Sequence, residues 1–156
     1  TVLVEGDDMN DPVADCLRSL LDGHVVLSRK LAEMGHYPAV DILQSVSRLM
    51  NSVVSREHRL AAQKFRAIYA TYLGAEDLIH IGALAKGSNR RIDKAVSLID
   101  RVQEFLIQPV GQKTPFARTR EWLADITKSW DFLLPEETGP NGKAAGGPPG
   151  RDEVRR

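Results

Sequence analysis

The chain lacks the features that mark several large classes of protein. It contains a single cysteine, Cys16, so it cannot form an internal disulfide, and this fits a reducing cytoplasm. No apolar run approaches the roughly 20 residues that a helix needs to cross a bilayer. The 21 basic and 21 acidic residues give a formal net charge of zero, so no overall field favours nucleic acid or a membrane surface as a partner. We therefore expect a cytoplasmic globular protein that does not bind nucleic acid.

Motifs for phosphate and metal binding are also missing. The sequence has no G-x-x-x-x-G-K-[ST] loop to hold phosphates, and no apolar strand ending in an aspartate that would hold magnesium. Asp7 and Asp8 stand side by side after an apolar run, a position typical of turn residues. The histidines show no ligand spacing on one helical face: His24, His36, His58 and His80. We expect no metal site within this chain.

The first 50 residues alternate between strand and helix patterns. The apolar run 2–4, ended by Gly6, predicts a buried strand, and residues 24–27 predict a second one. Between them, Pro12 and an apolar stripe predict a helix that closes at Gly23. Ser28 is suited to capping a short helix through Met34. This alternation indicates the late part of an α/β sheet domain.

From Ser55 onward the pattern is helical only. Three apolar stripes predict a small helical bundle over residues 55–134, with a possible kink at Gly74 in the first helix. The stripes are formed by Ala61, Phe65, Ile68, Tyr72 and Ile79; by Ile92, Val96, Ile99, Val102 and Leu106; and by Leu123, Ile126, Trp130 and Leu133. Residues 135–156 are rich in glycine, proline and charge, which predicts a disordered tail.

Two long segments carry a family resemblance. Residues 2–50 and the segment EHRLAAQKFRAIYATYLGAEDLIHIGALAKGSNRRIDKAV closely resemble the flagellar and type III secretion export ATPases, which are relatives of the rotary ATP synthase catalytic subunits. The sequence ATYLGAEDLIHIGA resembles the flagellar branch of the family more than the injectisome branch. The resemblance implies that residues 1–54 end a RecA-like P-loop nucleotide-binding domain and that residues 55–134 form the C-terminal helical domain. Residues 135–156 remain a tail.

The resemblance also implies an activity and partners. Such an ATPase would form a homohexameric ring and couple ATP hydrolysis to the unfolding and export of proteins. ATP and Mg²⁺ would be bound mainly by an upstream region, so this chain alone should be inactive. The implied partners are stalk and regulatory proteins of the export apparatus, export substrates and chaperones, with peripheral association at the inner-membrane export gate. Thr1 in place of an initiator methionine agrees with a start inside a longer protein.

Three residues match functional positions of the family. Arg48, in SVSRLM, matches the arginine finger that one subunit supplies to its neighbour's nucleotide, although it could instead pair with a local carboxylate such as Asp41. Tyr37, in GHYPAVD, matches an aromatic that stacks on adenine, unless it packs at the domain junction. Phe116, in QPVGQKTPF, lies where relatives place a second adenine-pocket aromatic, or it belongs to the bundle core. Val110 replaces another phenylalanine of that pocket.

Other features leave alternatives open. Arg29 is assigned no catalytic role, because an exposed charge at a helix start explains it equally well. The loop that is acidic in the rotary relatives is basic here, and it could meet an acidic partner or be solvated; its cations are Lys86, Arg90, Arg91 and Lys94. The chain could also be a non-catalytic helical module that binds export partners, or part of a virulence-type secretion ATPase. A phosphate-loop motif encoded upstream would favour the enzyme.

Overall fold

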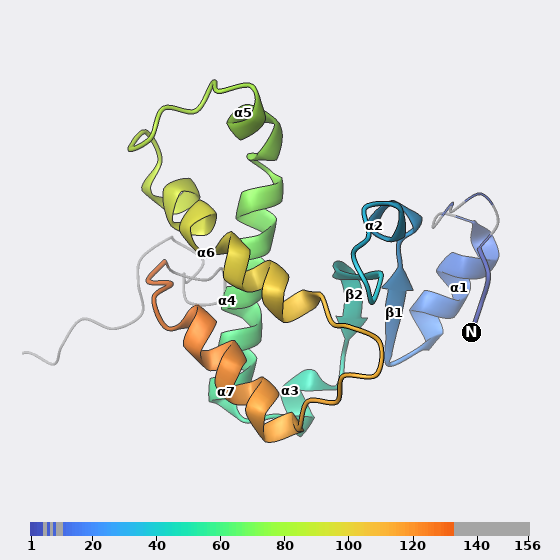
Figure 1. Cartoon of the computed structure of the whole chain (residues 1–156). Helices are drawn as coiled ribbons and strands as arrows, with labels where there is room; N and C mark the ends of the chain where they lie inside the picture. The colour runs from blue at the N-terminus through green and yellow to red at the C-terminus, as the bar shows by residue number, and fades with distance from the viewer. Residues whose placement is uncertain (5, 7, 9–10, 133–156) are drawn as a thin grey trace, which may run out of the picture.

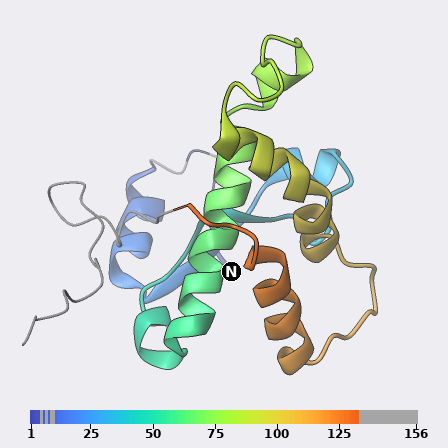
Figure 2. The same ribbon diagram turned by 90° about the vertical axis from the view of Figure 1, so that its left-hand side faces the viewer.

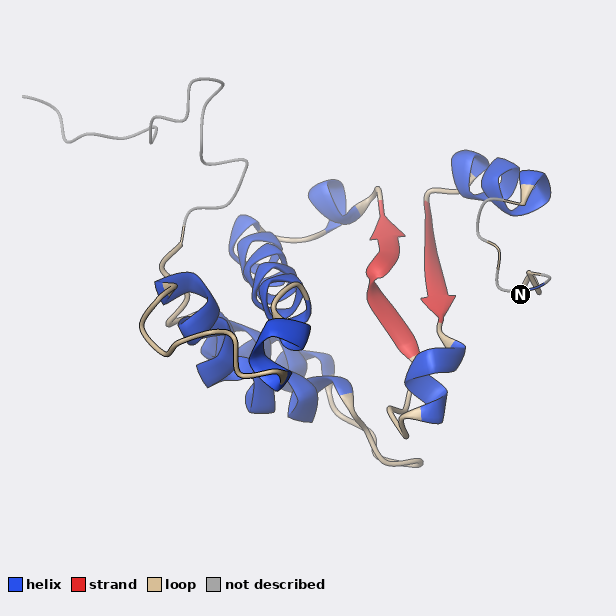
Figure 3. Cartoon of the chain, turned by 90° about the horizontal axis from the view of Figure 1, so that it is seen from above, coloured by secondary structure: helices blue, strands red, loops and turns tan. Residues whose placement is uncertain are grey.

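The structure is a computed structural model that describes residues 1–4, 6, 8 and 11–132. A bundle of helices lies on one side and a two-stranded sheet with two helices on the other (Figure 1). Seen from above, the sheet stands between the bundle and the first helix (Figure 3). The mixed strand and helix part followed by a helical part agrees with the predicted fold class. Leu133 and the predicted tail 135–156 lie outside the described residues.

The chain starts with an extended segment and helix α1 (Pro12–Leu20). Asp11 caps α1 by accepting hydrogen bonds from the backbone N–H groups of Val13 and Ala14, at 2.9 and 3.2 Å. The predicted helix is thus confirmed, but it ends at Leu20 with Leu21 as its C-cap, so Gly23 does not close it as predicted. The predicted strand at residues 2–4 is wrong, because these residues pair with neither described strand, and Leu3 is 95% exposed. An apolar run becomes a strand only where a neighbouring strand takes its backbone hydrogen bonds.

The sheet consists of β1 (Gly23–Leu27) and β2 (Val40–Ser47), which pair antiparallel, with α2 (Arg29–Glu33) in the connection. β1 and α2 were predicted and are confirmed: the Ser28 hydroxyl caps α2 by accepting from the Leu31 N–H at 3.3 Å. β2 was not predicted. Its segment VDILQSVS has apolar residues at irregular intervals, and the irregularity has a structural cause in the pairing register.

The register contains a bulge. Gly23 lies opposite Ser47 and His24 opposite Val46, but Val26 lies opposite Asp41, so residues 42–45 of β2 bulge out of the ladder. A Cβ atom on Gly23 would lie 2.6 Å from the carbonyl oxygen of Val46. The two backbones therefore approach so closely at this pair that only glycine fits opposite Ser47.

The bundle is built by α4 (Arg56–Leu73), α6 (Arg90–Leu106) and α7 (Phe116–Thr127), with short helices α3 (Met50–Val53) and α5 (Glu76–His80). Figure 2 shows α5 at the far tip of α4, away from the sheet. The buried core draws on all three long helices and on Trp130, which follows α7, so the third predicted stripe runs past the end of its helix. The core residues in the helices are Phe65, Ile68, Tyr69, Ala95, Leu98, Ile99, Val102, Leu123 and Ile126. Among the described residues, no helix is long and apolar enough to span a membrane.

Two details of the predicted bundle are wrong. The first long helix ends at Leu73, with Gly74 as its C-cap, so Ile79 belongs to the separate helix α5 rather than to a kinked continuation. In α6 the buried face is centred on Ala95 and Val102, both fully buried, while Val96 is 38% exposed. Small Ala95 allows close packing of α6, which a stripe chosen by large side chains alone does not reveal.

The Gly23 contact gives a stability test. Gly23→Ala should lower the free energy of unfolding by about 1–3 kcal/mol, because its Cβ must push the β2 backbone away. Urea denaturation of the chain measures this change. Val25→Ala on the same strand is the control, because that side chain is 69% exposed and its loss should cost clearly less. An unchanged midpoint for Gly23→Ala would show that the backbones do not approach as closely as described.

Candidate functional site

Arg48 stands directly after β2, at the surface. Its backbone N–H donates to the carbonyl oxygen of Asp22 at 2.8 Å, which continues the β1–β2 ladder by one step. Its guanidinium donates through Nη1 to the carbonyl of Ser19 at 3.0 Å and through Nη2 to that of Arg18 at 3.2 Å. Both carbonyls belong to the last turn of α1, where the helix dipole favours a cation. Arg48 is therefore held by backbone oxygens at a helix end.

Arg48 does not pair with Asp41, the alternative partner considered from the sequence. One carboxylate oxygen of Asp41 accepts from the backbone N–H groups of Leu43 and Gln44, at 2.9 and 3.0 Å. The other oxygen accepts from the side-chain amide of Gln44 at 2.9 Å. In the described part of the chain, the Arg48 guanidinium forms no salt bridge, so its positive charge is not neutralised by a carboxylate.

Tyr37 lies in the turn between α2 and β2, and its side chain is 53% exposed. The peptide bond from Tyr37 to Pro38 is cis. The carbonyl oxygen of Tyr37 accepts from the backbone N–H of Gln108 at 2.8 Å, so the loop after α6 is attached to this turn. The Tyr37 backbone thus makes one contact with the loop after α6, and the half-exposed Tyr37 ring is available to a planar ligand.

Phe116 is the first residue of α7 and is 67% exposed, so it does not belong to the bundle core. Its ring centroid lies 5.9 Å from that of His58 on α4, and the Arg120 guanidinium lies 6.0 Å from the same ring. Val110, in the preceding loop, is fully exposed. Tyr37 and Phe116 thus stand at the two ends of one loop, 107–115, and contact different neighbours.

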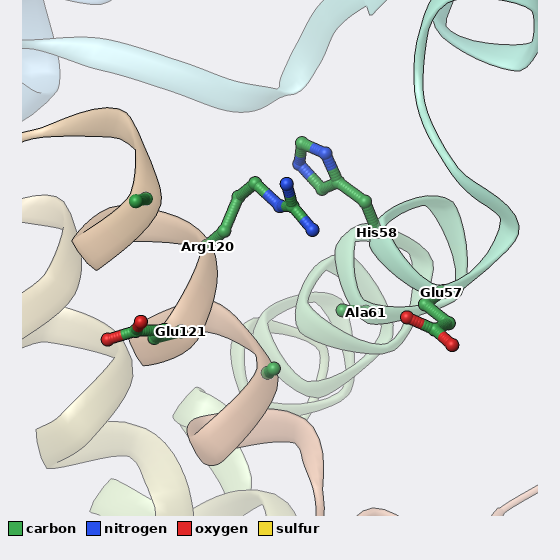
Figure 4. Close-up of a pocket in the computed structure, with 7 residues that line it drawn as sticks. Glu57, His58, Ala61, Arg120 and Glu121 are labelled. Carbon is green, nitrogen blue, oxygen red and sulfur yellow. The ribbon is translucent and has the colours of Figure 1, made fainter.

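A groove that the sequence did not predict lies beside Phe116, between α4 and α7. Its volume is about 320 Å³, and it is lined by Glu57, His58, Ala61, Ala117, Arg120, Glu121 and Ala124. The His58 ring and the Arg120 guanidinium point toward each other across it, while the carboxylates of Glu57 and Glu121 point away (Figure 4). His58 and Arg120 are 62 positions apart in the printed numbering, so no local spacing could have indicated the groove.

Arg66 is the second feature that sequence reasoning missed. From α4 it reaches the bulge of β2, where Nη1 donates to the carbonyls of Ile42 and Ser45, at 2.7 and 2.9 Å. Its Nη2 donates to the carbonyl of Leu43 at 2.9 Å. We call these three hydrogen bonds the Arg66 clamp. The planar fork of a guanidinium suits this task, because its donors diverge in fixed directions.

Side chains of the sheet satisfy most of the remaining bulge groups. The Ser45 hydroxyl donates to the Asp41 carbonyl at 2.6 Å and accepts from the backbone N–H of Val26 at 3.0 Å. His24 Nε2 lies 3.0 Å from the carbonyl of Gln44. Together with Asp41 and the Arg66 clamp, these contacts replace the ladder bonds that a bulge interrupts.

Of the four cations predicted to lie in one basic loop, only Lys86 does; Arg90, Arg91 and Lys94 belong to the first turns of α6. Arg90 forms a salt bridge with Asp131. The Arg91 guanidinium lies 5.7 Å from the Trp130 ring and 5.9 Å from the Phe132 ring, a cation–π arrangement. Two of the four cations thus contact the segment after α7. The interpretation as a surface for an acidic partner stays a prediction that rests mainly on Lys86 and Lys94.

The described residues fit the base of a nucleotide better than its phosphates. The exposed Tyr37 ring offers a face for a base. Among the residues that the structure describes, no group of three histidine, cysteine, aspartate or glutamate side chains could hold a metal ion. The sequence also has no phosphate loop. The described residues therefore offer no site for a triphosphate or for magnesium.

Two family models match consecutive parts of the chain. Residues 1–47 match the nucleotide-binding domain of the ATP synthase alpha/beta family, and residues 54–125 match the T3SS EscN ATPase C-terminal domain. The flagellum-specific ATP synthase of Bacillus subtilis strain 168 is 51% identical over 127 residues, and the type 3 secretion system ATPase of Pseudomonas savastanoi pv. phaseolicola is 48% identical over 127 residues. Each alignment covers 81% of this chain and 28% of the relative.

Solved structures agree with these matches. The assembled ATPase EscN from the enteropathogenic E. coli type III secretion system aligns with a TM-score of 0.78 at 42% identity, covering 81% of this chain and 31% of EscN. EscN in complex with its central stalk EscO aligns with a TM-score of 0.71 at 40% identity, covering 74% and 29%. The chain thus spans less than a third of the length of these relatives. It belongs to the family of flagellar and type III secretion ATPases and resembles their C-terminal portion.

Proposed function

We propose that this chain is the C-terminal portion of an ATPase that powers protein export, and that it supplies Arg48 in trans and Tyr37 in cis to nucleotide sites of a ring. The observation that carries the proposal is the exposure of Arg48 and the way its guanidinium is held. It is exposed, follows β2 directly, and is held by neutral carbonyls of α1. A guanidinium whose charge no carboxylate neutralises can stabilise negative charge on phosphoryl oxygens.

We place the domain boundary after residue 54. Residues 1–54 would complete a nucleotide-binding domain, residues 55–134 would form the C-terminal helical domain, and residues 135–156 would be a tail. The family matches, which end at 47 and begin at 54, support this division. So does the start of α4 at Arg56, with Ser55 as its cap.

In this proposal Tyr37 binds the adenine. The hydrogen bond from Gln108 joins the Tyr37 turn to the loop after α6, and this bond fixes the backbone that carries the ring. Phe116 would form a second, outer wall of the adenine site. Bound Mg²⁺·ATP would supply the phosphoryl group that is transferred to water, and phosphate-loop residues outside this sequence would hold it. The residues of this chain orient the base and stabilise charge.

The ring assembly rests on the relatives. The structures of assembled EscN, alone and with its central stalk EscO, support a homohexamer with a stalk partner for this chain's longer protein. Regulatory proteins, export substrates and chaperones would be further partners. We place the protein in the cytoplasm, peripherally at the inner-membrane export gate. Flagellar and virulence-type systems both fit, because relatives of the two kinds share similar sequence identity with this chain.

Arg48 can be tested in a chimera in which this chain replaces the matching segment of the Bacillus subtilis relative. Arg48→Ala should lower kcat about 1,000-fold or more and leave nucleotide binding nearly intact, because the finger acts on the transition state. ATP turnover and equilibrium binding of a fluorescent ATP analogue measure this. Arg56→Ala is the control, because Arg56 is exposed and begins α4. Unchanged turnover in Arg48→Ala would refute the role.

Tyr37 can be tested in the same chimera. Tyr37→Ala should raise the KM for ATP about 5- to 150-fold with a smaller change in kcat, because stacking on adenine contributes about 1–3 kcal/mol. Tyr37→Phe keeps the ring and should behave like the parent. Steady-state kinetics at varied ATP separate the two constants. A KM that does not change in Tyr37→Ala would contradict the adenine assignment.

The chain on its own gives a third test. Without a phosphate loop it should hydrolyse no ATP above background, measured as phosphate release with Mg²⁺ present. The intact chimera at the same concentration is the positive control. Turnover by the isolated chain that survives repeated purification would show that its own residues bind and activate the triphosphate, contrary to the proposal.

A further inference from the structure

The bulge of β2 lies where the sheet meets the bundle. Ile42 and Leu43, two of its residues, pack against the bundle core. The other side of the bulge faces β1, through the bond from the Val26 N–H to the Ser45 hydroxyl. The bulge thus contacts both the helices of the bundle and β1, the strand that follows α1.

The Arg66 clamp is the polar connection across this junction. One side chain of α4 holds three carbonyls of the bulge, each at 2.9 Å or less. A charged donor forms stronger hydrogen bonds than a neutral one. In the described structure, this is where a side chain of the bundle binds the β2 backbone directly.

The bulge controls what comes after it. Residues 46–47 return to the ladder opposite Gly23 and His24, and the Arg48 N–H then donates to Asp22. Since side chains alternate between the two faces of a strand, a slip of one residue in the bulge would turn Arg48 to the opposite face. The size of the bulge therefore decides whether the Arg48 guanidinium reaches the end of α1.

We propose that Arg66 is a positioning residue for Arg48: it fixes the bulge, the bulge fixes the register of residues 46–48, and the register aims the guanidinium. This inference rests on the proposed function of Arg48. It also gives a physical link from the helical bundle to the nucleotide site, because a displacement of α4 moves the Arg66 clamp and with it the strand that ends at Arg48.

Arg66 lies outside the core of the bundle. It is exposed, and the core of α4 consists of Phe65, Ile68 and Tyr69 on its buried face. Substitution of Arg66 should therefore leave the helices folded while it frees the bulge. This separates a positioning role from a general role in stability.

The test uses Arg66→Gln in the chimera described above. We expect kcat for ATP to fall about 10- to 100-fold with little change in KM, because a misplaced catalytic group slows the chemical step. Arg66→Lys should recover part of the loss, since lysine keeps the charge but lacks the fork. Arg56→Gln, on the same helix, is the matched control and should keep the parent's kcat.

A double variant distinguishes positioning from other effects. If Arg66 acts through Arg48, then Arg48→Ala with Arg66→Gln should turn over ATP no more slowly than Arg48→Ala alone. Losses that multiply would overturn the inference. Normal kcat in Arg66→Gln, with a strong loss in Arg48→Ala, would overturn it while the proposed function stands. Normal kcat in Arg48→Ala would instead reject the proposed function.

A second measurement does not depend on the chimera. In this chain, amide hydrogen exchange of Arg48, whose N–H is bonded to Asp22, should speed up at least tenfold in Arg66→Gln, while the amides of α6 stay protected. Arg56→Gln should leave both unchanged. Unaltered exchange at Arg48 in Arg66→Gln would show that the bulge keeps its register without the clamp, and would overturn the inference.

Discussion

The contact between one guanidinium of α4 and three carbonyls of β2 is the interaction on which the arrangement of this chain depends. Each half is stabilised by contacts of its own. The bundle has a buried apolar core, and the sheet part has the close approach of the two strands at Gly23 and the capped helix α2. Apolar packing of Ile42 and Leu43 brings the halves together but is not directional. The Arg66 clamp adds direction, because it requires a particular backbone conformation in residues 42–45.

This conformation explains the placement of the candidate site. Arg48 is exposed and directly follows a short sheet, so its position depends on bonds made by other residues. Asp41 and Ser45 bond to each other and to the bulge, Asp22 accepts from the Arg48 backbone, and α1 carbonyls accept from its guanidinium. Tyr37 is held in a similar way, by a backbone bond from the loop after α6. Both side chains remain accessible while their backbones are fixed, as expected for residues that would meet a ligand supplied from outside the chain.

Local signals predicted much of this fold. Pro12 and Ser28 marked the starts of α1 and α2, and the three apolar stripes located the long helices, although the third stripe runs past the end of α7. The strand at 2–4 and the unpredicted β2 show the limit, since strand formation depends on a partner and β2 is interrupted by a bulge that breaks its alternation. Arg66 and the groove at His58 and Arg120 could not be predicted, because their contacts join residues far apart in sequence. The roles of Arg48, Tyr37 and Phe116 were predicted from the family resemblance. All three residues are exposed, as residues that bind a ligand must be.

In the proposed function, Arg48 acts on the nucleotide of a neighbouring subunit. Mixed rings test this most directly. One chimera would carry Arg48→Ala with an intact phosphate loop, and the other would carry Arg48 with its phosphate-loop lysine replaced. If the arginine acts in trans, mixing the two inactive proteins should restore ATP turnover to a sizeable fraction of the parent's, because each Arg48 can serve the intact site beside it. Mixed rings that assemble but stay as inactive as either protein alone would show that Arg48 does not act in trans.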